Sequence, residues 1–337
     1  MTKEQITKLV SEGQFPGNAR PDLIETHISW VLISDQFVYK IKKPMHYSFL
    51  DFSTPEKRKY YCEREVELNR RLTSNIYLDV VTIREAYGRF FMDVQTGETI
   101  DHAVKMKKMD RSRQMDVLLL NNKITQTDIR SLAKIIADFH KNTDIVYNTD
   151  ILRIRNDFSD LIEQNDYLRE HLNSDCCTII HQSIETSDVF INKHKDLLYG
   201  RLNAGFFRDC HGDLHCRNIF FLPDPKPFDC IEFNDDYRRI DVLNEVAFLC
   251  MDLEAFGNQE FSELFINTYN QIFPCMQGKQ EHDLFIYYKG YRANIRAKVN
   301  SLRARSAAYD ADRRSALIET TKYLQLMNSY MKAIRVA

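Results

Sequence analysis

Residues 208–233 read RDCHGDLHCRNIFFLPDPKPFDCIEF, and this stretch decides the fold. Two apolar runs, residues 219–222 and 228–231, lie on either side of the segment Pro-Asp-Pro-Lys-Pro at 223–227. Prolines at this density interrupt a strand, and connections of about two to five residues are typical of β-hairpins. The stretch therefore predicts two short antiparallel strands joined by a five-residue loop.

The register of this hairpin would bring two oxygen-bearing side chains together. Pairing Leu222 with Phe228 places Asn218 opposite Glu232 at the open end of the hairpin. Directly opposed residues have Cβ atoms about 4.5–5.5 Å apart. An amide oxygen and a carboxylate at that spacing suit Mg²⁺, which prefers oxygen ligands and keeps several waters. We predict a magnesium site at Asn218 and Glu232, with Asp229 as the alternative acid.

Asp213 lies five residues before Asn218, on the segment that leads into the hairpin. Phosphoryl transfer to a hydroxyl requires an aspartate beside a Mg²⁺ site. The ion neutralises phosphate charge, and the carboxylate orients the hydroxyl and accepts its proton. The structural alternative is that Asp213 and Asn218 only cap turns, as such residues commonly do. The predicted hairpin brings Glu232 back beside Asn218, and this second acid favours the catalytic interpretation.

The composition narrows the class of protein. The 337 residues carry 46 Lys and Arg against 48 Asp and Glu, and this charge of −2 excludes a general nucleic-acid binder. The first twenty residues have no apolar signal-peptide core, and no apolar run reaches the roughly 18–20 residues of a membrane helix. Eight cysteines without a C-x-x-C pair disfavour zinc, although Cys210, His211, His215 and Cys216 form a loose ligand cluster. We expect a cytoplasmic protein that binds neither nucleic acid nor membrane.

The N-terminal third supplies a second functional element. Residues 55–72 have the capping residues and apolar spacing of a helix, and Glu65 falls on its apolar stripe. A carboxylate that faces a core needs a cation. Lys40, on a strand predicted at 36–42, is the expected partner, and Lys42 on the same strand face is the alternative. Such a pair can hold a lysine against nucleotide phosphates.

The order of the predicted elements gives an α+β chain with two lobes. The small lobe covers residues 1–106 and contains the helix together with strands at 27–34, 36–42, 79–86, 89–94 and 102–106. The larger, mostly helical lobe covers residues 107–337, with a helix at 127–141, helical pieces between 155 and 200, the segment 211–218 and the hairpin 219–233. A small mixed lobe followed by a helical lobe with one hairpin is a specific architecture.

These residues resemble the aminoglycoside phosphotransferase branch of the protein-kinase-like superfamily, the type that includes choline kinase. The family pattern H-x-D-x-x-x-x-N stands here as His211-Gly212-Asp213-Leu214-His215-Cys216-Arg217-Asn218. The segments THISWVLISDQFVYKIKKP and DCIEFNDDYRRIDVLNEVAFLCMDLE further resemble an uncharacterised bacterial subgroup, some of whose members are fused to a P-loop kinase. The resemblance spans roughly residues 25–255 and implies a bilobal protein-kinase-like fold.

The resemblance implies roles for the residues of the catalytic segment. It implies Mg²⁺ as cofactor and ATP as co-substrate. Asp213 would be the catalytic base, with His211 and Asn218 beside it in the catalytic loop. Asn218 and Glu232 would bind the metal, and Asp241 would support the loop from below, ahead of the acidic helix start at Glu245.

The resemblance also implies a nucleotide site in the small lobe. Lys40 and Glu65 would position the phosphates, and Ser29 would contact them from the phosphate-covering turn. The adenine would lie against the interlobe hinge, which in this chain holds Met106, Lys107 and Met109.

Three features depart from the family pattern. Glu232 stands where the family usually has aspartate. The turn Thr26-His27-Ile28-Ser29 takes the place of the phosphate-covering loop but contains no glycine, so its backbone would approach phosphate less closely. An insert of about 60 residues at 144–206 precedes the catalytic segment and would either shape an acceptor pocket or widen the helical lobe.

The C-terminal region indicates the kind of acceptor. Tyr288, Arg292 and Arg296 recur at helical spacing, and residues 284–337 hold eleven Lys and Arg against three Asp and Glu, a net charge of +8. In the family the C-terminal helices help to build the acceptor site, so an arginine pair would hold an anionic acceptor. The alternative is a solvated basic helix face. A basic region disfavours a polycationic aminoglycoside as substrate.

Together these features predict an ATP- and Mg²⁺-dependent phosphotransferase that moves the γ-phosphate of ATP to a hydroxyl of a small, anionic molecule. The alternative is a nucleotide-binding pseudokinase with a regulatory role, which the glycine-free turn and Glu232 motivate. The sequence predicts no particular oligomeric state.

Overall fold

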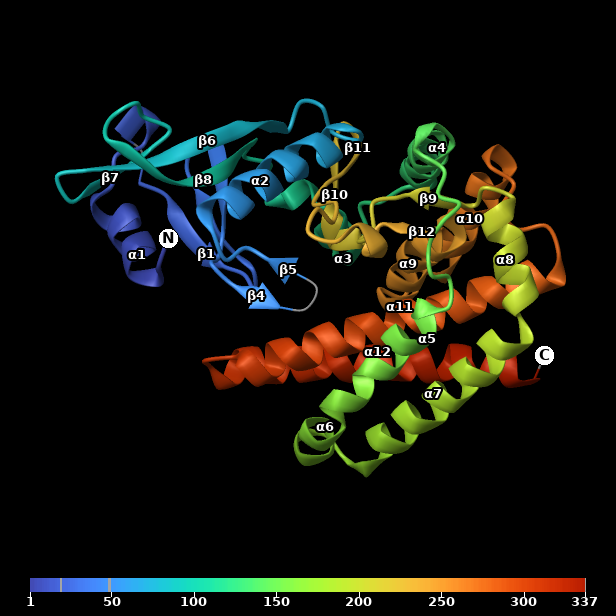
Figure 1. Cartoon of the computed structure of the whole chain (residues 1–337). Coiled ribbons are helices and arrows are strands. Elements are labelled where there is room, and N and C mark those ends of the chain that lie inside the picture. The colour runs from blue at the N-terminus through green and yellow to red at the C-terminus, as the bar shows by residue number, and fades with distance from the viewer. Residues whose placement is uncertain (19, 48–49, 337) are drawn as a thin grey trace. The chain divides into compact units, whose positions relative to one another are not determined.

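The computed structural model describes residues 1–18, 20–47 and 50–336, and the chain divides into two compact units (Figure 1). We call Met1–Val117 together with Asn218–Tyr237 the sheet unit, and Leu118–Arg217 together with Arg238–Ala337 the helical unit. The sequence placed a boundary at residues 106–107 and the hairpin in the helical lobe. Packing instead groups the hairpin segment 218–237 with the sheet unit.

An antiparallel sheet in the order β1-β2-β3-β8-β6-β7 forms the centre of the sheet unit. Its strands are β1 (Asp22–Glu25), β2 (Ser29–Ile33), β3 (Phe37–Lys42), β6 (Tyr77–Ala86), β7 (Arg89–Met92) and β8 (Glu98–Lys107). A further short pair is formed by β4 (His46–Tyr47) and β5 (Leu50–Asp51). The predicted strands at 27–34, 36–42, 79–86, 89–94 and 102–106 are confirmed, and β1 was not foreseen.

Two helices cover the sheet. Residues of α1 (Lys3–Glu12) share a buried apolar cluster with Tyr39 and Ile41 of β3. Residues of α2 (Pro55–Arg70) share a second cluster with β6 and β8. Because side chains alternate along a strand, β3 directs Tyr39 and Ile41 to the α1 side and Lys40 and Lys42 to the α2 side. Helix α2 begins at the predicted cap, where Thr54 accepts the Lys57 N–H and proline fills the first turn.

The hairpin forms, but its predicted register is wrong. Strands β10 (Ile219–Leu222) and β11 (Asp224–Pro227) pair with Leu222 opposite Asp224, so the connection is a tight turn at Pro223. The N–H of Phe228 donates to the carbonyl of Asn218 at 2.9 Å, which puts Phe228, not Glu232, opposite Asn218. Pro225 and Pro227 alternate with residues that pair through hydrogen bonds, and a two-stranded ribbon has only edge strands, so their missing N–H groups cost little.

The helical unit is built around a buried helix and a long helix pair. Every residue from 242 to 253 of α9 (Val242–Ala255) is buried. Figure 1 shows α11 (Lys279–Ser306) and α12 (Asp310–Val336) running side by side. The helical unit also contains α4 (Gln126–Asn142), α10 (Gln259–Ile272), the strand pair β9 (Phe207–Asp209) and β12 (Arg239–Asp241), and part of α3 (Met115–Leu120), which begins in the sheet unit. The helix predicted at 127–141 is confirmed as α4.

The insert at 144–206 is helical, as predicted, and packs on the C-terminal helix pair. It consists of α5 (Arg153–Ser159), α6 (Asn165–His171), α7 (Ser174–Lys193) and α8 (Lys195–Asn203). The ring of Phe190 in α7 stacks on Tyr287 of α11 with centroids 4.7 Å apart. Lys298 of α11 donates to Asp160 at 2.9 Å. These contacts favour the interpretation that the insert widens the helical lobe.

All eight cysteines are free thiols, and only Cys177 is more than slightly exposed. Among the described helices, none is both long and apolar enough to cross a membrane.

Candidate active site

A network of five charged side chains lies in the sheet unit. Glu65 of α2 accepts from the Nζ of Lys40 at 2.9 Å and from the Nζ of Lys42 at 2.7 Å. Lys40 also donates to Oδ1 of Asp229 at 2.6 Å, and Lys42 donates to Glu232. Both lysines that the sequence offered as partners of Glu65 therefore bind it. Each one also binds an acid from the segment that follows the hairpin.

The side chains of this network differ in their access to solvent. Lys42, Glu65 and Glu232 are buried, whereas the side chain of Asp229 is 43% exposed. Burial alone would raise the pKa of Glu65, but the charges of Lys40 and Lys42 outweigh it and lower that pKa to about 2. Burial likewise opposes the charge on Lys42, yet Glu232 and Glu65 raise the pKa of its ammonium above its ordinary value. Of the three acids in this network, Asp229 is therefore the one that solvent reaches.

The backbone at Asp229 has an unusual conformation. Its φ is +63°, in the left-handed region that most L-residues avoid and aspartate tolerates. The N–H of Asp229 donates to the hydroxyl of Tyr77 at 3.0 Å, and the next N–H, of Cys230, donates to Oδ1 of Asn69 at 2.9 Å. Such conformations persist where surrounding contacts enforce them, often at functional sites. The segment after the hairpin is therefore held in place by β6 and α2.

The structure does not bring Asn218 and Glu232 together in the predicted way. Glu232 is taken up by Lys42 in the interior of the sheet unit. Asp229 directly follows the residue that pairs with Asn218 across the hairpin. The acid that the sequence offered as the alternative thus lies next to the paired position and is the more accessible of the two.

The glycine-free turn between β1 and β2 is closed by its own side chains. The N–H and the hydroxyl of Thr26 both donate to the carbonyl of Ser29 at 2.9 Å, and the Ser29 N–H donates back to Oγ1 of Thr26. Lys43, the residue after β3, stabilises the turn by donating to the Thr26 carbonyl and to Glu25. Thr26 and His27 are exposed, but the Ser29 side chain is buried. The Ser29 hydroxyl expected to reach phosphate therefore lies beneath the turn.

The predicted hinge residues lie at the end of β8. Met106 pairs with Val38 and Tyr77 in the sheet and belongs to the buried cluster on the α2 side. Met109, Leu222 and Phe228 are partly buried and pack against that cluster. The exposed Lys107 donates its N–H to the carbonyl of Ile76 at 2.9 Å. These side chains form a partly open apolar patch in the sheet unit.

In the helical unit, the segment around Asp213 is held by buried side chains of α9 and α11. Glu245 accepts the N–H of His211 at 2.7 Å and the N–H of Gly212 at 3.0 Å. Arg292 donates to the Gly212 carbonyl at 3.1 Å and to Oδ1 of Asn244 at 2.7 Å. The backbone before Asp213 is therefore fixed from both its N–H and its carbonyl side.

Asp213 itself is only partly enclosed. Its side chain is 37% exposed, its N–H donates to Nδ1 of His211 at 3.3 Å, and its Oδ2 lies 3.4 Å from Nε2 of His215. Desolvation opposes ionisation of Asp213, but His215 and Arg296 outweigh it and hold the pKa of this carboxyl below its ordinary value. Asp213 is therefore an ionised carboxylate with solvent access at neutral pH.

Asp241 supports the segment around Asp213 only indirectly. Its carboxylate binds the guanidinium of Arg201 at 2.6 and 2.8 Å, accepts the N–H of Leu243 to cap α9, and accepts the hydroxyl of Tyr288 at 3.2 Å. The direct contact with the loop that the sequence assigned to Asp241 is made by Glu245, one turn further along α9.

The three residues proposed for acceptor binding have structural partners. Tyr288, Arg292 and Arg296 are all buried. Tyr288 binds Asp241, Arg292 binds Gly212, and the Nη1 of Arg296 lies 3.5 Å from Nε2 of His215. A solvated basic face is therefore wrong for these residues. Their contacts place them in the support of the loop.

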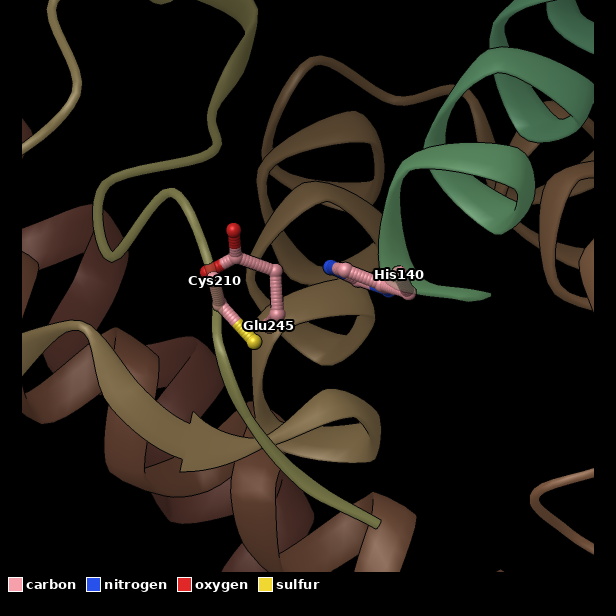
Figure 2. A group of neighbouring side chains, drawn as sticks. All are labelled: His140, Cys210 and Glu245. Carbon is pink, nitrogen blue, oxygen red and sulfur yellow. The ribbon is translucent and has the colours of Figure 1, made fainter. Parts of the chain in front are cut away.

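A cluster of metal-ligand-type side chains lies under the loop. Figure 2 shows His140, Cys210 and Glu245, whose ligand atoms lie within 4.8 Å of one another. His140 also shares a hydrogen bond of 2.7 Å between Nδ1 and the hydroxyl of Tyr269. Because the Glu245 carboxylate binds the backbone N–H groups of residues 211 and 212, the cluster is accounted for as support for the loop. It is not the four-residue set that the sequence offered for zinc.

Several supporting residues were not foreseen. Asp252 accepts the Cys216 N–H at 2.9 Å, and Arg201 clamps Asp241. The available signal was the placement of Glu245 and Asp252 inside an otherwise apolar helix, since buried acids in such a run need donors. No sequence signal separated Asp229 from Glu232, because that distinction depends on the register of the hairpin.

Glu245 makes the stability of the protein depend on pH. Burial raises its pKa from 4.5 to about 7, although Arg292 partly offsets the effect. The folded state then holds the proton more tightly than the unfolded chain does. This contribution is complete below about pH 4.5 and is lost as the pH rises through about 7, an effect of about 3 kcal/mol.

Glu245→Gln is therefore expected to flatten the pH dependence of the unfolding temperature between about pH 5 and pH 8. The amide oxygen can still accept the N–H groups of His211 and Gly212, but it does not titrate. Thermal unfolding of both proteins across this range checks the prediction. Parallel curves would show that Glu245 titrates normally.

No model of a known protein family matches the chain. Two uncharacterised proteins, Rv2004c of Mycobacterium tuberculosis and Mb2027c of Mycobacterium bovis, are each 28% identical to it over 314 residues, or 90% of this chain. The chain spans about 60% of the length of these relatives.

Solved structures resemble the whole chain. A choline/ethanolamine kinase family protein from Mesorhizobium loti matches with a TM-score of 0.53 and 11% identity, covering 99% of both chains. An aminoglycoside phosphotransferase from Alicyclobacillus acidocaldarius matches with a TM-score of 0.50 and 11% identity, covering 100% of this chain and 96% of that one. The AMP-bound spectinomycin phosphotransferase APH(9)-Ia matches with a TM-score of 0.51 and 12% identity, covering 97% and 98%. As the sequence predicted, the chain has the bilobal fold of the aminoglycoside phosphotransferases and choline kinases, and it is homologous to uncharacterised mycobacterial proteins.

Proposed function

We propose that the protein is an ATP- and Mg²⁺-dependent phosphotransferase that moves the γ-phosphate of ATP to a hydroxyl of a small molecule. The observation that carries the proposal is the contact of Lys40 with both Glu65 and Asp229. A lysine held by a helix carboxylate, beside an accessible acid, combines the groups that position nucleotide phosphates and their metal ion. Structures of the same fold support a nucleotide, since APH(9)-Ia was solved with AMP and a mutant of aminoglycoside 2'-phosphotransferase-IIIa with GDP.

The nucleotide would bind in the sheet unit. Lys40 would leave Asp229 to contact the phosphates while Glu65 keeps it in place. The partly buried apolar patch around Met106 and Met109 would take the adenine, with the Lys107 carbonyl and the Met109 N–H at its polar edge. The exposed backbone of the β1–β2 turn would cover the phosphates in place of the Ser29 side chain.

The residues present fit a magnesium ion at Asn218 and Asp229. An amide oxygen and an exposed carboxylate are hard oxygen donors, the type that Mg²⁺ takes beside substrate phosphates. Glu232 is a poorer candidate because its carboxylate is buried against Lys42. When bound, the ion would neutralise charge on the phosphates.

Asp213 would act as the general base. Its ionised carboxylate would accept the acceptor's hydroxyl proton as the hydroxyl oxygen bonds to the γ-phosphorus. The bond from that phosphorus to the β,γ-bridging oxygen breaks in the same step, and ADP leaves with the electron pair. The contacts of Glu245 and Arg292 with residues 211 and 212 would keep the base in position.

The acceptor would be a small hydroxylated molecule. Its anionic character is supported by the other charged residues of 284–337, where nine Lys and Arg besides Arg292 and Arg296 stand against three Asp and Glu, a net charge of +6. Tyr288, Arg292 and Arg296 no longer contribute to that argument, because the loop and its supports occupy them.

A second candidate function is a nucleotide-binding pseudokinase with a regulatory role. The burial of the Ser29 hydroxyl beneath a glycine-free turn favours it, because that turn offers fewer groups to phosphate. Thermal stabilisation by ATP without turnover, in wild type and in Asp213→Asn alike, would support this candidate over a phosphotransferase.

The metal assignment is tested by the Mg²⁺ dependence of ATP turnover. Asp229→Asn is expected to raise the Mg²⁺ concentration for half-maximal turnover by about 10–100-fold, because it removes a charged ligand. Asp224→Asn, on the exposed turn of the same hairpin, is the control and should leave the titration unchanged. If Glu232→Gln raised the Mg²⁺ concentration for half-maximal turnover more than Asp229→Asn does, Glu232 and not Asp229 would be the metal ligand.

A further inference from the structure

Basic side chains from three elements of the helical unit gather beside the segment that contains Asp213. Arg217, four residues after Asp213, has its Nη2 3.6 Å from Oε2 of Glu319 on α12. Lys322, about one turn further along α12, donates its Nζ to Oε1 of the same carboxylate at 2.9 Å. Glu319 is therefore shared by two cations, one of which belongs to the catalytic segment.

Arg303 of α11 adds a third cation to this group. Helix α11 runs beside α12 (Figure 1). Arg303 follows Arg296 by seven residues, which is about two helical turns, so both lie on one face of α11. That face is the one toward the segment around Asp213, because Nη1 of Arg296 lies 3.5 Å from Nε2 of His215. Arg296 is buried and Arg303 is exposed, so the face ends in a guanidinium that solvent reaches.

The charges of this group do not cancel. The pKa of Arg303 is lowered, first by desolvation and then by the charge of Arg217, and Glu319 offsets the effect only in part. Asp312 also acts on Arg303, more weakly than Glu319 does. An arginine stays protonated at physiological pH, so the two guanidinium groups repel each other across a shared acid. An anion that binds both of them would remove this repulsion.

The charge and reach of this group suit a phosphate ester. A phosphate monoester carries up to about two negative charges at pH 7 and offers three terminal oxygens, which two arginines can bind together. The side chains of Asp213 and Arg217 are 37% and 36% exposed, so one molecule can contact both. Their Cα atoms are at most about 14 Å apart, because four residues span no more than that. A small molecule with a hydroxyl at one end and a phosphate at the other covers this span.

We propose that Arg217 and Arg303 bind a phosphate group that the acceptor already carries, so that the substrate is a hydroxylated phosphate monoester. This inference rests on the proposed phosphotransferase function and names its substrate class. The acceptor hydroxyl lies against Asp213, which takes its proton, while the hydroxyl oxygen bonds to the γ-phosphorus of ATP and ADP leaves. The phosphate held by the two arginines does not react, so the product carries two phosphate groups.

Inorganic phosphate is the probe for the two arginines, and calorimetric titration of the full chain measures its binding. Arg217→Met and Arg303→Met are each expected to weaken phosphate binding by at least about tenfold, because each removes a guanidinium. Arg305→Met is the matched control. It removes the same charge from α11 at an exposed residue about 200° further round the helix, and the affinity should change by less than about twofold. Equal losses in Arg303→Met and Arg305→Met would overturn the inference.

Glu319→Gln is expected to change the affinity in the opposite direction. It removes the negative charge that Arg217 and Lys322 share, so phosphate binding should tighten by about 3–10-fold. A destabilised protein would not gain affinity for phosphate, so this variant separates the explanation from a folding defect. Unchanged or weaker phosphate binding in Glu319→Gln would overturn the inference.

The phosphates of the nucleotide are the competing ligand for the same arginines. The phosphate titration is therefore repeated with the protein saturated with Mg²⁺ and β,γ-methylene-ATP, which cannot donate its γ-phosphate. Phosphate binding is expected to persist with an affinity within about threefold of that without the nucleotide. Its loss would assign Arg217 and Arg303 to the nucleotide and overturn the inference.

The acceptor class is tested by turnover with MgATP and matched pools, which contain sugar and polyol monophosphates or the same compounds without the phosphate. The monophosphates are expected to be the better acceptors by at least about 100-fold in kcat/KM, and Arg303→Met should raise their KM about 10–100-fold. Equal turnover of the two pools would overturn the inference. If wild type phosphorylates neither pool, the proposed function fails, and the phosphate titrations still decide whether the two arginines form a phosphate site.

Discussion

Replacing Asp213 with asparagine is expected to lower phosphoryl transfer by about 10³-fold, because the amide has the shape of the carboxylate but cannot accept a proton. Nucleotide binding should be unchanged, since the groups proposed to bind it belong to the sheet unit. The fold should also persist, because Asp213 is partly exposed and its loop is fixed by backbone contacts with Glu245 and Arg292. Steady-state ATP turnover and calorimetric titration with nucleotide measure the two effects separately.

Asp188→Asn provides the control for this substitution. Asp188 belongs to the same unit, is also 37% exposed and also faces a cation, Arg155, at 2.7 Å. It lies in the insert helix α7 and has no proposed catalytic role. Equal losses in both variants, or more than a tenth of wild-type turnover in Asp213→Asn, would contradict the assignment of Asp213 as base.

The second large effect is expected in stability. Lys42→Met should destabilise the sheet unit by about 3–5 kcal/mol, because it leaves Glu65 and Glu232 buried without one of their cations. Denaturant unfolding followed by the fluorescence of Trp30, which lies in the same sheet, measures the change. The size of the effect comes mainly from the uncompensated acids, since a buried ion pair contributes little net stability over an apolar replacement.

Two further variants separate this explanation from a simple packing defect. Adding Glu232→Gln to Lys42→Met should restore part of the stability, because it removes one of the stranded charges. Lys43→Met, at the next residue, breaks a pair with the more exposed Glu25 and should cost less than about 1 kcal/mol. A double variant less stable than Lys42→Met would mean that the buried charges are not the cause.

The sheet and its ion pairs were largely predictable because they follow from local periodicity. Alternation along residues 37–42 sorts Tyr39 and Ile41 from Lys40 and Lys42, and the apolar stripe of α2 contains Glu65. Neither pattern could show that both lysines bind Glu65, or that Asp229 and Glu232 also bind these lysines. The contacts of the two lysines with Asp229 and Glu232 join segments about 190 residues apart, and only the folded sheet unit brings them together.

The hairpin shows why its predicted register was wrong. The prolines at 223, 225 and 227 were interpreted as a loop, whereas 225 and 227 occupy alternate positions of an edge strand that need no N–H. The predicted register was therefore off by four residues: it placed Glu232 opposite Asn218, where the structure has Phe228. A similar limit applies to Tyr288, Arg292 and Arg296: their spacing predicted one helix face but could not show that these side chains are buried against Asp241, Gly212 and His215.

Phosphorus NMR of the protein with MgATP and pooled hydroxylated metabolites tests the central claim most directly. We expect the γ-phosphate resonance to fall while a phosphate-ester resonance and ADP grow, in the presence of Mg²⁺ and not in Asp213→Asn. Nucleotide binding with no ester from any pool, or an ester that forms equally in wild type and Asp213→Asn, would contradict the phosphotransferase account.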